Sequence, residues 1–238
     1  MKMRRKYLLP VLILLPIFAC TPPPQSNGPT RPTVDTPKGP NSFQMITGDD
    51  TDEERERWNT MYKTHAYVFG KEPTPFLKEH IQMLGKGRAL VIPMEEGRNA
   101  VFLATAGFTV AGIDFSEIAL QKANRLAREN KVKVTGINAD LNHYVVDREA
   151  YDLIVDIDFH RPRLIQQIKQ GLKKGGIVLY QAQTVDQMKV GHDRNNISQD
   201  YLLDHGQLKE LFKDFQILVY KETSEGESAV ASLIAKKP

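Results

Sequence analysis

The 238-residue sequence contains a single cysteine, Cys20, so an internal disulfide is impossible and the fold must rest on its apolar core. It also lacks a membrane-spanning run, because the twelve residues 7–18 are interrupted by two prolines and a spanning helix needs about 20. No basic cluster with interleaved aromatic residues is present, which argues against nucleic-acid binding. The length then suits one globular domain with appendages.

The N-terminal appendage has the pattern of a secretory signal. A basic stretch, residues 2–6, precedes the apolar run, and Ala19 follows it as a small residue before Cys20. The sequence 17–20, Ile-Phe-Ala-Cys, resembles the lipobox of bacterial lipoproteins, in which the cysteine is acylated and becomes the new N-terminus. The alternative is a chance cysteine beside a cleavage site. We predict a signal peptide over 1–19 and lipid anchoring through Cys20 to a membrane of the bacterial cell envelope, facing the periplasm or the exterior.

The segment 20–50 is predicted to be a tether. Most of it, residues 21–41, is rich in Pro, Thr, Ser and Gly and has almost no large apolar side chain that could pack. Removal of the signal also removes four positive charges, so the formal charge of +3 falls to about 3 − 4 = −1. The folded domain is predicted over 51–238, beginning at a capping box formed by Thr51 and Glu54.

Strand and helix patterns alternate along this domain. A first helix is predicted to start near Thr51, with an apolar stripe at residues 58, 61 and 62. Further helices are predicted at 76–84, 99–106, 116–130, 162–172 and 205–212, and strands at 89–93, 109–113, 132–137, 151–157, 177–181, 215–220 and 229–235. Ser116 is predicted to cap its helix, and Lys-Lys-Gly-Gly at 173–176 to end a helix and form a turn. Short connections and apolar strands predict an α/β fold with a mostly parallel sheet covered by helices on both faces. Residues 221–228 are too few for a helical crossover, so the last two strands are predicted to form an antiparallel hairpin.

Residues 86–116 carry a longer motif. It reads Gly-Arg-Ala-Leu at 87–90, Glu-Gly-Arg-Asn-Ala-Val-Phe-Leu-Ala at 96–104, Gly-Phe at 107–108 and Gly-Ile-Asp-Phe-Ser at 112–116. This run resembles class I S-adenosylmethionine (SAM) dependent methyltransferases, and most of all their tellurite-resistance and thiopurine-methyltransferase-like groups. The likeness covers about residues 58–238. It implies a Rossmann-like sheet, SAM as the cofactor and a small-molecule methyl acceptor.

Three positions of that family pattern are candidate cofactor residues. Gly97 lies where a strand turns into a helix, and the absence of a side chain there would let a ligand approach the backbone at a helix N-terminus, which favours the carboxylate of SAM. Asp114, at the end of the second strand, offers two acceptor oxygens for ribose hydroxyls. Asp140 follows the third strand, and the resemblance implies that it faces the adenine amino group. The alternative is that both acids merely cap turns after strands.

The end of the fourth strand borders the methyl acceptor in this family. His160 is the candidate catalytic residue there, as a base or as an orienting group, although the sequence favours the plainer interpretation of a polar entry to the next helix. Asp156 and Asp158 share a face by strand alternation, but two carboxylates without further ligands indicate no metal site. Tyr180 and Gln181 are predicted to end the fifth strand and to line the cleft for the methyl acceptor together with these residues.

Glu95 departs from the family pattern and is a candidate cofactor-binding residue. It replaces a glycine that faces the methionine portion of SAM, and a positive φ there would cost about 1 kcal/mol. Its carboxylate can point inward and repel the ligand carboxylate, point to solvent, or pair with the ligand ammonium group.

Export raises a second difficulty, because SAM is made and used in the cytoplasm. Translation that starts at Met45 would give a cytoplasmic enzyme and remove this difficulty. The well-formed signal at residues 1–19 would then have arisen by chance. Three functions stay open: an exported, lipid-anchored SAM-dependent methyltransferase acting on a small molecule, a non-catalytic binding protein with a degenerate SAM loop, and an envelope scaffold that uses the domain as a surface.

Overall fold

The computed structural model describes residues 51–190, 201–226 and 228–238. The predicted signal peptide, the tether and Cys20 lie outside the described residues, as does the side chain of Thr51 that was expected to form a capping box. Within the described part of the chain, no helix combines the length and the apolar character needed to cross a membrane.

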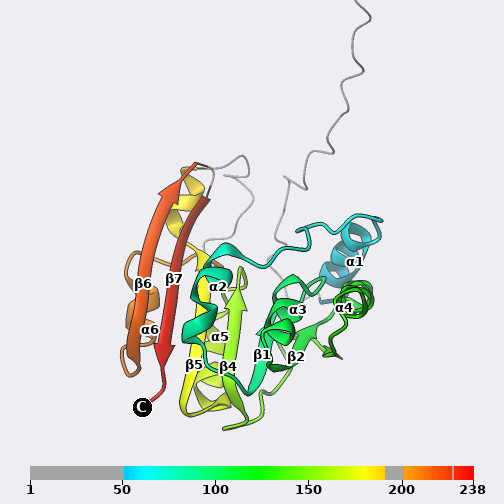
Figure 1. Ribbon diagram of the computed structural model, residues 1–238. Coiled ribbons are helices and arrows are strands. Elements are labelled where there is room, and N and C mark those ends of the chain that lie inside the picture. The colour runs from blue at the N-terminus through cyan, green and yellow to red at the C-terminus, as the bar shows by residue number, and fades with distance from the viewer. Residues whose placement is uncertain (1–50, 191–200, 227) are drawn as a thin grey trace, which may run out of the picture. The chain divides into compact units, whose positions relative to one another are not determined.

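The described residues form a seven-stranded sheet in the order β3-β2-β1-β4-β5-β7-β6. The strands are β1 (Arg88–Ile92), β2 (Thr109–Asp114), β3 (Val134–Asn138), β4 (Tyr151–Ile157), β5 (Leu172–Gln183), β6 (Gln216–Glu225) and β7 (Ser228–Lys236). The first five pair in parallel, whereas β7 is antiparallel to both β5 and β6 and lies between them (Figure 1). The predicted α/β class and its C-terminal hairpin are confirmed.

Helices cover both faces of this sheet. They are α1 (Thr51–Tyr62), α2 (Pro75–His80), η1 (Ile81–Met83), α3 (Arg98–Thr105), α4 (Glu117–Glu129), α5 (Pro162–Gly171), η2 (Val185–Met188) and α6 (Gln207–Leu211). Successive strand residues point to opposite faces, so in β4 Leu153 packs with α2, α3 and α4 while Ile154 packs with α5 and α6. Each face therefore has its own apolar core.

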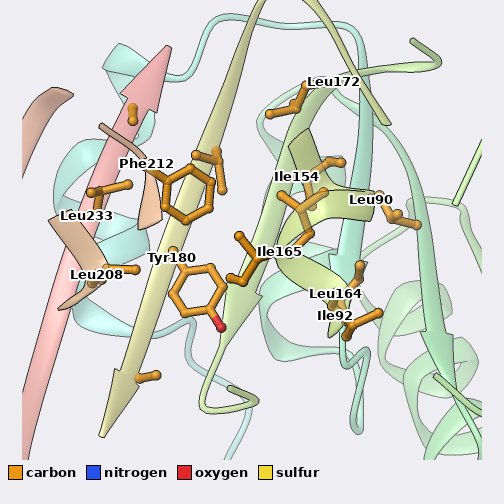
Figure 2. Close-up of a cluster of buried hydrophobic side chains, with 14 of the residues drawn as sticks. Leu90, Ile92, Ile154, Leu164, Ile165, Leu172, Tyr180, Leu208, Phe212 and Leu233 are labelled. Atoms are coloured by element: carbon orange, nitrogen blue, oxygen red, sulfur yellow. The ribbon is translucent and has the colours of Figure 1, made fainter. Parts of the chain in front are cut away.

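Tyr180 lies in the core beneath α5 and α6 (Figure 2). Its side chain is fully buried, and its ring centroid is 5.9 Å from that of Phe212. The prediction that Tyr180 ends its strand and lines a cleft is wrong, because β5 continues to Gln183. Gln181 likewise lies within the strand and donates to the hydroxyl of Ser232 on β7 at 2.7 Å.

The start of β5 also differs from the prediction. The Lys-Lys-Gly-Gly sequence at 173–176 was expected to form a turn, but β5 already begins at Leu172. Gly175 donates to the carbonyl of Lys237, and the N–H of Lys237 donates to the carbonyl of Gly176. Pairing with a segment about 60 residues away in sequence, which local turn signals cannot reveal, overrides the turn. By contrast, Ser116 caps α4 as predicted, accepting from the N–H of Ala119 at 3.2 Å.

Candidate functional site

The connection between β1 and α3 is the loop with the family motif. β1 ends at Ile92 and α3 begins at Arg98, with Gly97 as its N-cap residue at φ 92°. Glu95 also has a positive φ, of 53°. Its backbone is thus left-handed, a conformation that glycine adopts freely and that costs a residue with a Cβ atom about 1 kcal/mol or more. The loop has this shape although the glycine is absent.

Gly97 allows two helices to approach closely. A Cβ atom at this position would lie 2.7 Å from the Cβ and 2.8 Å from the Cα of Ala123 on α4. The missing side chain at Gly97 therefore makes room for α4. A direct contact between Gly97 and a cofactor stays a prediction.

Asp114 lies at the end of β2, next to this loop, and is only 3% exposed. One carboxylate oxygen accepts from the N–H of Glu95 at 2.8 Å, and the other accepts from the N–H of Ser116 at 2.9 Å. Burial raises the pKa of Asp114 to about 6, while these backbone donors act in the opposite direction. Each oxygen still has acceptor capacity beyond these bonds, as binding of a pair of hydroxyl groups would require.

The Glu95 side chain is turned into the protein and is not free in solvent. Its carboxylate lies 3.3 Å from Nε of Arg98, and the two side chains are 11% and 15% exposed. The same guanidinium lies 3.9 Å from the carboxylate of Asp158. Burial raises the pKa of Glu95 to about 8, although Arg98 lowers it. Sequence reasoning did not identify Arg98 as the partner, because nothing in the pattern fixes where either long side chain points.

Helix α1 and the segment after it cover this edge of the sheet. Asn59 on α1 accepts from the hydroxyl of Ser116 at 2.6 Å. The rings of Trp58 and Tyr62 stack at 5.6 Å, and Phe69 lies edge-on to Tyr62 at 6.4 Å. Arg98 in turn lies 5.3 Å from the centre of the Phe69 ring. An aromatic wall therefore stands over the loop that holds Glu95.

A buried ion pair attaches that covering segment to α4. Glu96 pairs with Lys122, and the two side chains are 2% and 6% exposed. Lys122 also donates to the carbonyls of Tyr62, Thr64 and Ala66, at 3.2, 3.1 and 2.6 Å. Glu96 accepts from the N–H of Val68 at 2.6 Å. Sequence reasoning missed this pair, since a glutamate and a lysine 26 positions apart look like two surface charges.

Asp140 uses both carboxylate oxygens locally. One accepts from the N–H of Asn142 at 2.8 Å, and the other lies 2.8 Å from Nδ1 of His143. This is the turn-capping role weighed as the alternative. The backbone nevertheless brings Asp140 close to Asp114, because Asn138, two residues earlier, pairs with Asp114 across β3 and β2. Its contact with adenine stays a prediction.

The end of β4 carries a second pair of acids. Asp156 is fully buried, and neither of its carboxylate oxygens has a hydrogen-bond partner within the described ranges. Burial raises its pKa well above the usual range. Asp158 lies just beyond the strand at φ 62°, and its side chain is 45% exposed. The two acids do not share a face as predicted, because the left-handed backbone at Asp158 ends the strand alternation.

His160 is buried beside Tyr180. Its Nδ1 lies 2.8 Å from the Tyr180 hydroxyl, and the residue is 3% exposed. Burial, with a contribution from the Arg161 guanidinium, lowers the pKa of His160 to about 4. The imidazole is therefore neutral at pH 7 and is a weak base. It lies at the predicted edge of the sheet, and its catalytic role stays a prediction.

A sequence model of the family described as "Tellurite resistance protein TehB" matches residues 61–228, well over half of the chain. The chain belongs to the TehB family. This confirms the family resemblance seen in the motif at residues 86–116. No curated protein sequence gives a significant match to this TehB-family chain.

Solved structures share the fold of this TehB-family protein. TehB from Haemophilus influenzae superposes with a TM-score of 0.60 at 20% identity, covering 78% of this chain and 67% of that one. A SAM-dependent methyltransferase from Mesorhizobium loti has a TM-score of 0.53 at 16% identity, covering 68% and 96%. A possible exported protein from Bordetella parapertussis has a TM-score of 0.54 at 18% identity, covering 76% and 79%.

Proposed function

We propose that this TehB-family protein is a SAM-dependent methyltransferase that acts on a small molecule while anchored by lipid in the cell envelope. The observation that carries the proposal is the hydrogen bond from the backbone of Glu95 to Asp114. It holds the loop after β1 and the acid at the end of β2 together, at the strand ends where the family resemblance leads us to expect a nucleoside. Solved methyltransferases with the same fold support SAM as the ligand of this site.

The chain offers distinct groups for the parts of such a ligand. Asp114 would accept from the ribose hydroxyls, and Asp140, near the end of β3, would lie toward the base. The loop 94–97 would border the remaining part of the ligand, beyond the ribose and the base. When bound, SAM supplies a methyl group on a positively charged sulfur, which a lone pair on the acceptor can attack. The protein contributes mainly position, because alignment of the two reactants alone removes much of the barrier.

Two features of the chain suit that task. The aromatic wall of Trp58, Tyr62 and Phe69 would exclude water from the loop, which strengthens the electrostatic interactions beneath it. On the acceptor side, His160 would act as an orienting group held by Tyr180, since a neutral imidazole with a pKa of about 4 is a poor base at pH 7.

One observation favours the non-catalytic alternative. Glu95 brings a carboxylate to the loop and pairs it with Arg98, so part of the region suited to ligand charge is already occupied by the chain itself. A binding protein that keeps the fold without transfer activity would tolerate this change. Asp114, which would accept from the ribose hydroxyls, is present in this chain. For that reason we favour the methyltransferase over the non-catalytic binding protein.

The test is ligand binding by the full-length chain in detergent. Trp58 is the only tryptophan and stands in the aromatic wall, so its fluorescence reports on the site. We expect SAM or its demethylated product to change this signal, and Asp114→Asn to weaken binding at least tenfold. Asp147→Asn, at an exposed position, is the matched control. The proposal is wrong if the natural chain binds neither SAM nor its demethylated product at millimolar concentration. Binding that appears only in Glu95→Gly would favour the non-catalytic alternative.

Envelope anchoring is tested separately. The basic, apolar and Ala-Cys pattern of residues 2–20 supports it, as does the likeness to a possible exported protein. We expect Cys20→Ala to abolish acyl labelling and membrane retention in a bacterial host. Unchanged retention of this variant would contradict lipid anchoring and leave the binding result unaffected.

A further inference from the structure

A pocket of about 490 Å³ lies where the segment that follows α1 meets α4. Its lining comes from residues between 65 and 71 and from Arg125 and Glu129, which are four positions apart on α4 and so share a face. Its volume is within the range of roughly 300–1,000 Å³ that is usual for small-ligand pockets. The lining includes none of the candidate cofactor residues. The pocket is therefore a separate feature of the chain.

The wall of this pocket that comes from the segment after α1 is held firmly against α4. The hydroxyl of Tyr67 donates to the carbonyl of Lys122 at 3.2 Å. The side chain of Lys122 donates to the carbonyls of Thr64 and Ala66, at 3.1 and 2.6 Å, and is itself buried and paired with Glu96. The pocket is therefore preformed, and a ligand would lose little affinity to the ordering of the chain.

Cations gather around the Tyr67 ring. The ammonium group of Lys71 lies 4.9 Å and the guanidinium group of Arg125 lies 5.5 Å from the centre of this ring. Nε of Arg125 donates to the Tyr67 hydroxyl at 3.4 Å, which orients the guanidinium group at the pocket. In the described part of the chain Arg125 forms no ion pair. The arginine is thus positioned by a neutral partner and has no counterion.

Glu129 is the only acid in the lining, and several cations act on it. Its carboxylate lies 2.7 Å from Nζ of Lys71. This hydrogen bond lowers the pKa of Glu129, and the charges of Arg125 and Arg128 act in the same direction. Three cations around one carboxylate give a local charge of 3 − 1 = +2. Neighbouring like charges on a helix face repel one another, so an anion would stabilise this arrangement.

We propose that this pocket binds a phosphate group, with Arg125 and Lys71 as its two charged partners. A phosphate monoester carries a charge of about −1.5 to −2 at pH 7 and three strong acceptor oxygens, whereas a carboxylate carries a single charge. The fork of an arginine side chain matches two phosphate oxygens at once. A soluble phosphate ester and the headgroup of an anionic phospholipid both present this chemistry. The inference does not depend on SAM binding.

The experiment is calorimetric titration of the full-length chain in an uncharged detergent at constant ionic strength. Glycerol 3-phosphate is the soluble ligand, and dihexanoyl phosphatidic acid presents the same phosphate on a short lipid. Glycerol and dihexanoylglycerol, which lack the phosphate, are the blanks. The variants are Arg125→Gln and Glu129→Gln, and Arg148→Gln, at an exposed position outside the pocket, is the matched control. Thermal melting of each variant shows whether it is folded.

We expect the natural chain to bind at least one phosphate ligand at millimolar concentration or below, and neither blank. Arg125→Gln should weaken binding about tenfold or more, because a charge-assisted pair is lost. Glu129→Gln should strengthen it at least threefold, because Lys71 is then released to the ligand, and Arg148→Gln should leave it unchanged. Tighter binding of phosphatidic acid than of glycerol 3-phosphate would identify a lipid headgroup as the source, and equal binding a soluble ester.

Three results would overturn the inference. They are the absence of binding of both phosphate ligands by the natural chain, equal binding by the natural chain and Arg125→Gln, and no gain in Glu129→Gln. The proposed function would stand in each case, because SAM binding is measured separately and depends on other residues.

Discussion

The backbone of Glu95 donates a hydrogen bond of 2.8 Å to the carboxylate of Asp114, and so joins the loop after β1 to the end of β2. The backbone and the side chain of Glu95 therefore have opposite effects on the proposed site. Its backbone holds in place the acid on which the proposed site depends, whereas its side chain adds a charge that the family pattern lacks. The predictions below separate these two contributions from each other and from the packing around them.

The first prediction concerns the dependence of stability on pH. Burial raises the pKa of Glu95 from 4.5 to about 8, so the folded state holds a proton that the unfolded state loses above pH 4.5. The favourable contribution of the protonated acid is therefore complete below pH 4.5 and is lost as pH rises to about 8. We expect Glu95→Gln to be more stable than the natural chain at about pH 9, by on the order of 1 kcal/mol for each unit of pKa shift, and the difference to shrink toward pH 5. Urea denaturation at both pH values measures it, and a constant difference would contradict it.

The second prediction isolates the backbone of Glu95. At φ 53° an alanine has the same steric penalty as the glutamate, whereas a glycine has none. We expect Glu95→Gly to be about 1 kcal/mol more stable than Glu95→Ala, since both variants lose the carboxylate and only one relieves the left-handed conformation. Denaturation midpoints of the two variants provide the comparison. Equal stability would mean that the loop relaxes at this position.

The third prediction concerns the buried ion pair under the aromatic wall. Glu96→Gln or Lys122→Met leaves a partner buried without its countercharge, which typically costs about 3–5 kcal/mol. The exposed pair of Lys71 and Glu129, whose side chains are 50% and 45% exposed, is the control, and Lys71→Met should cost about 0–1 kcal/mol. The double variant of the buried pair should cost less than the sum of the single variants, because neither charge is then left alone. Strict additivity would show that the two residues act independently.

The fourth prediction concerns the contact between the loop and α4. Gly97→Ala would place a Cβ atom 2.7 Å from that of Ala123, in addition to the strain of φ 92°. We expect a loss of about 2–4 kcal/mol, the sum of overpacking and backbone strain. Gly206, at φ 75°, has no atom within 4 Å of such a Cβ, so Gly206→Ala should lose only about 1 kcal/mol. Similar losses in the two variants would mean that α4 moves aside.

The order of elements followed from local patterns. The alternation of strands and helices predicted a mostly parallel sheet, and the short connection before the last strand predicted a terminal hairpin. The structure has both, and Ser116 caps α4 as its position predicted. The prediction of a turn at 173–176 was wrong because the backbone of this segment pairs with Lys237, far along the chain. The prediction that Asp158 shares a face with Asp156 was wrong for another reason. Strand alternation assumes an extended backbone, and the backbone of Asp158 is left-handed.

By itself, then, the sequence determined the architecture, the family and the placement of Gly97, Asp114, Asp140 and His160 at or shortly after the ends of strands. These features depend on periodicity and on residue types at set spacings. Only the tertiary structure decided what the long charged side chains do. It turned Glu95 onto Arg98, buried Lys122 against Glu96 and left Asp156 without a partner. The physical reason is that a flexible charged side chain has many rotamers, and its choice depends on desolvation and on partners that come together only when distant segments pack.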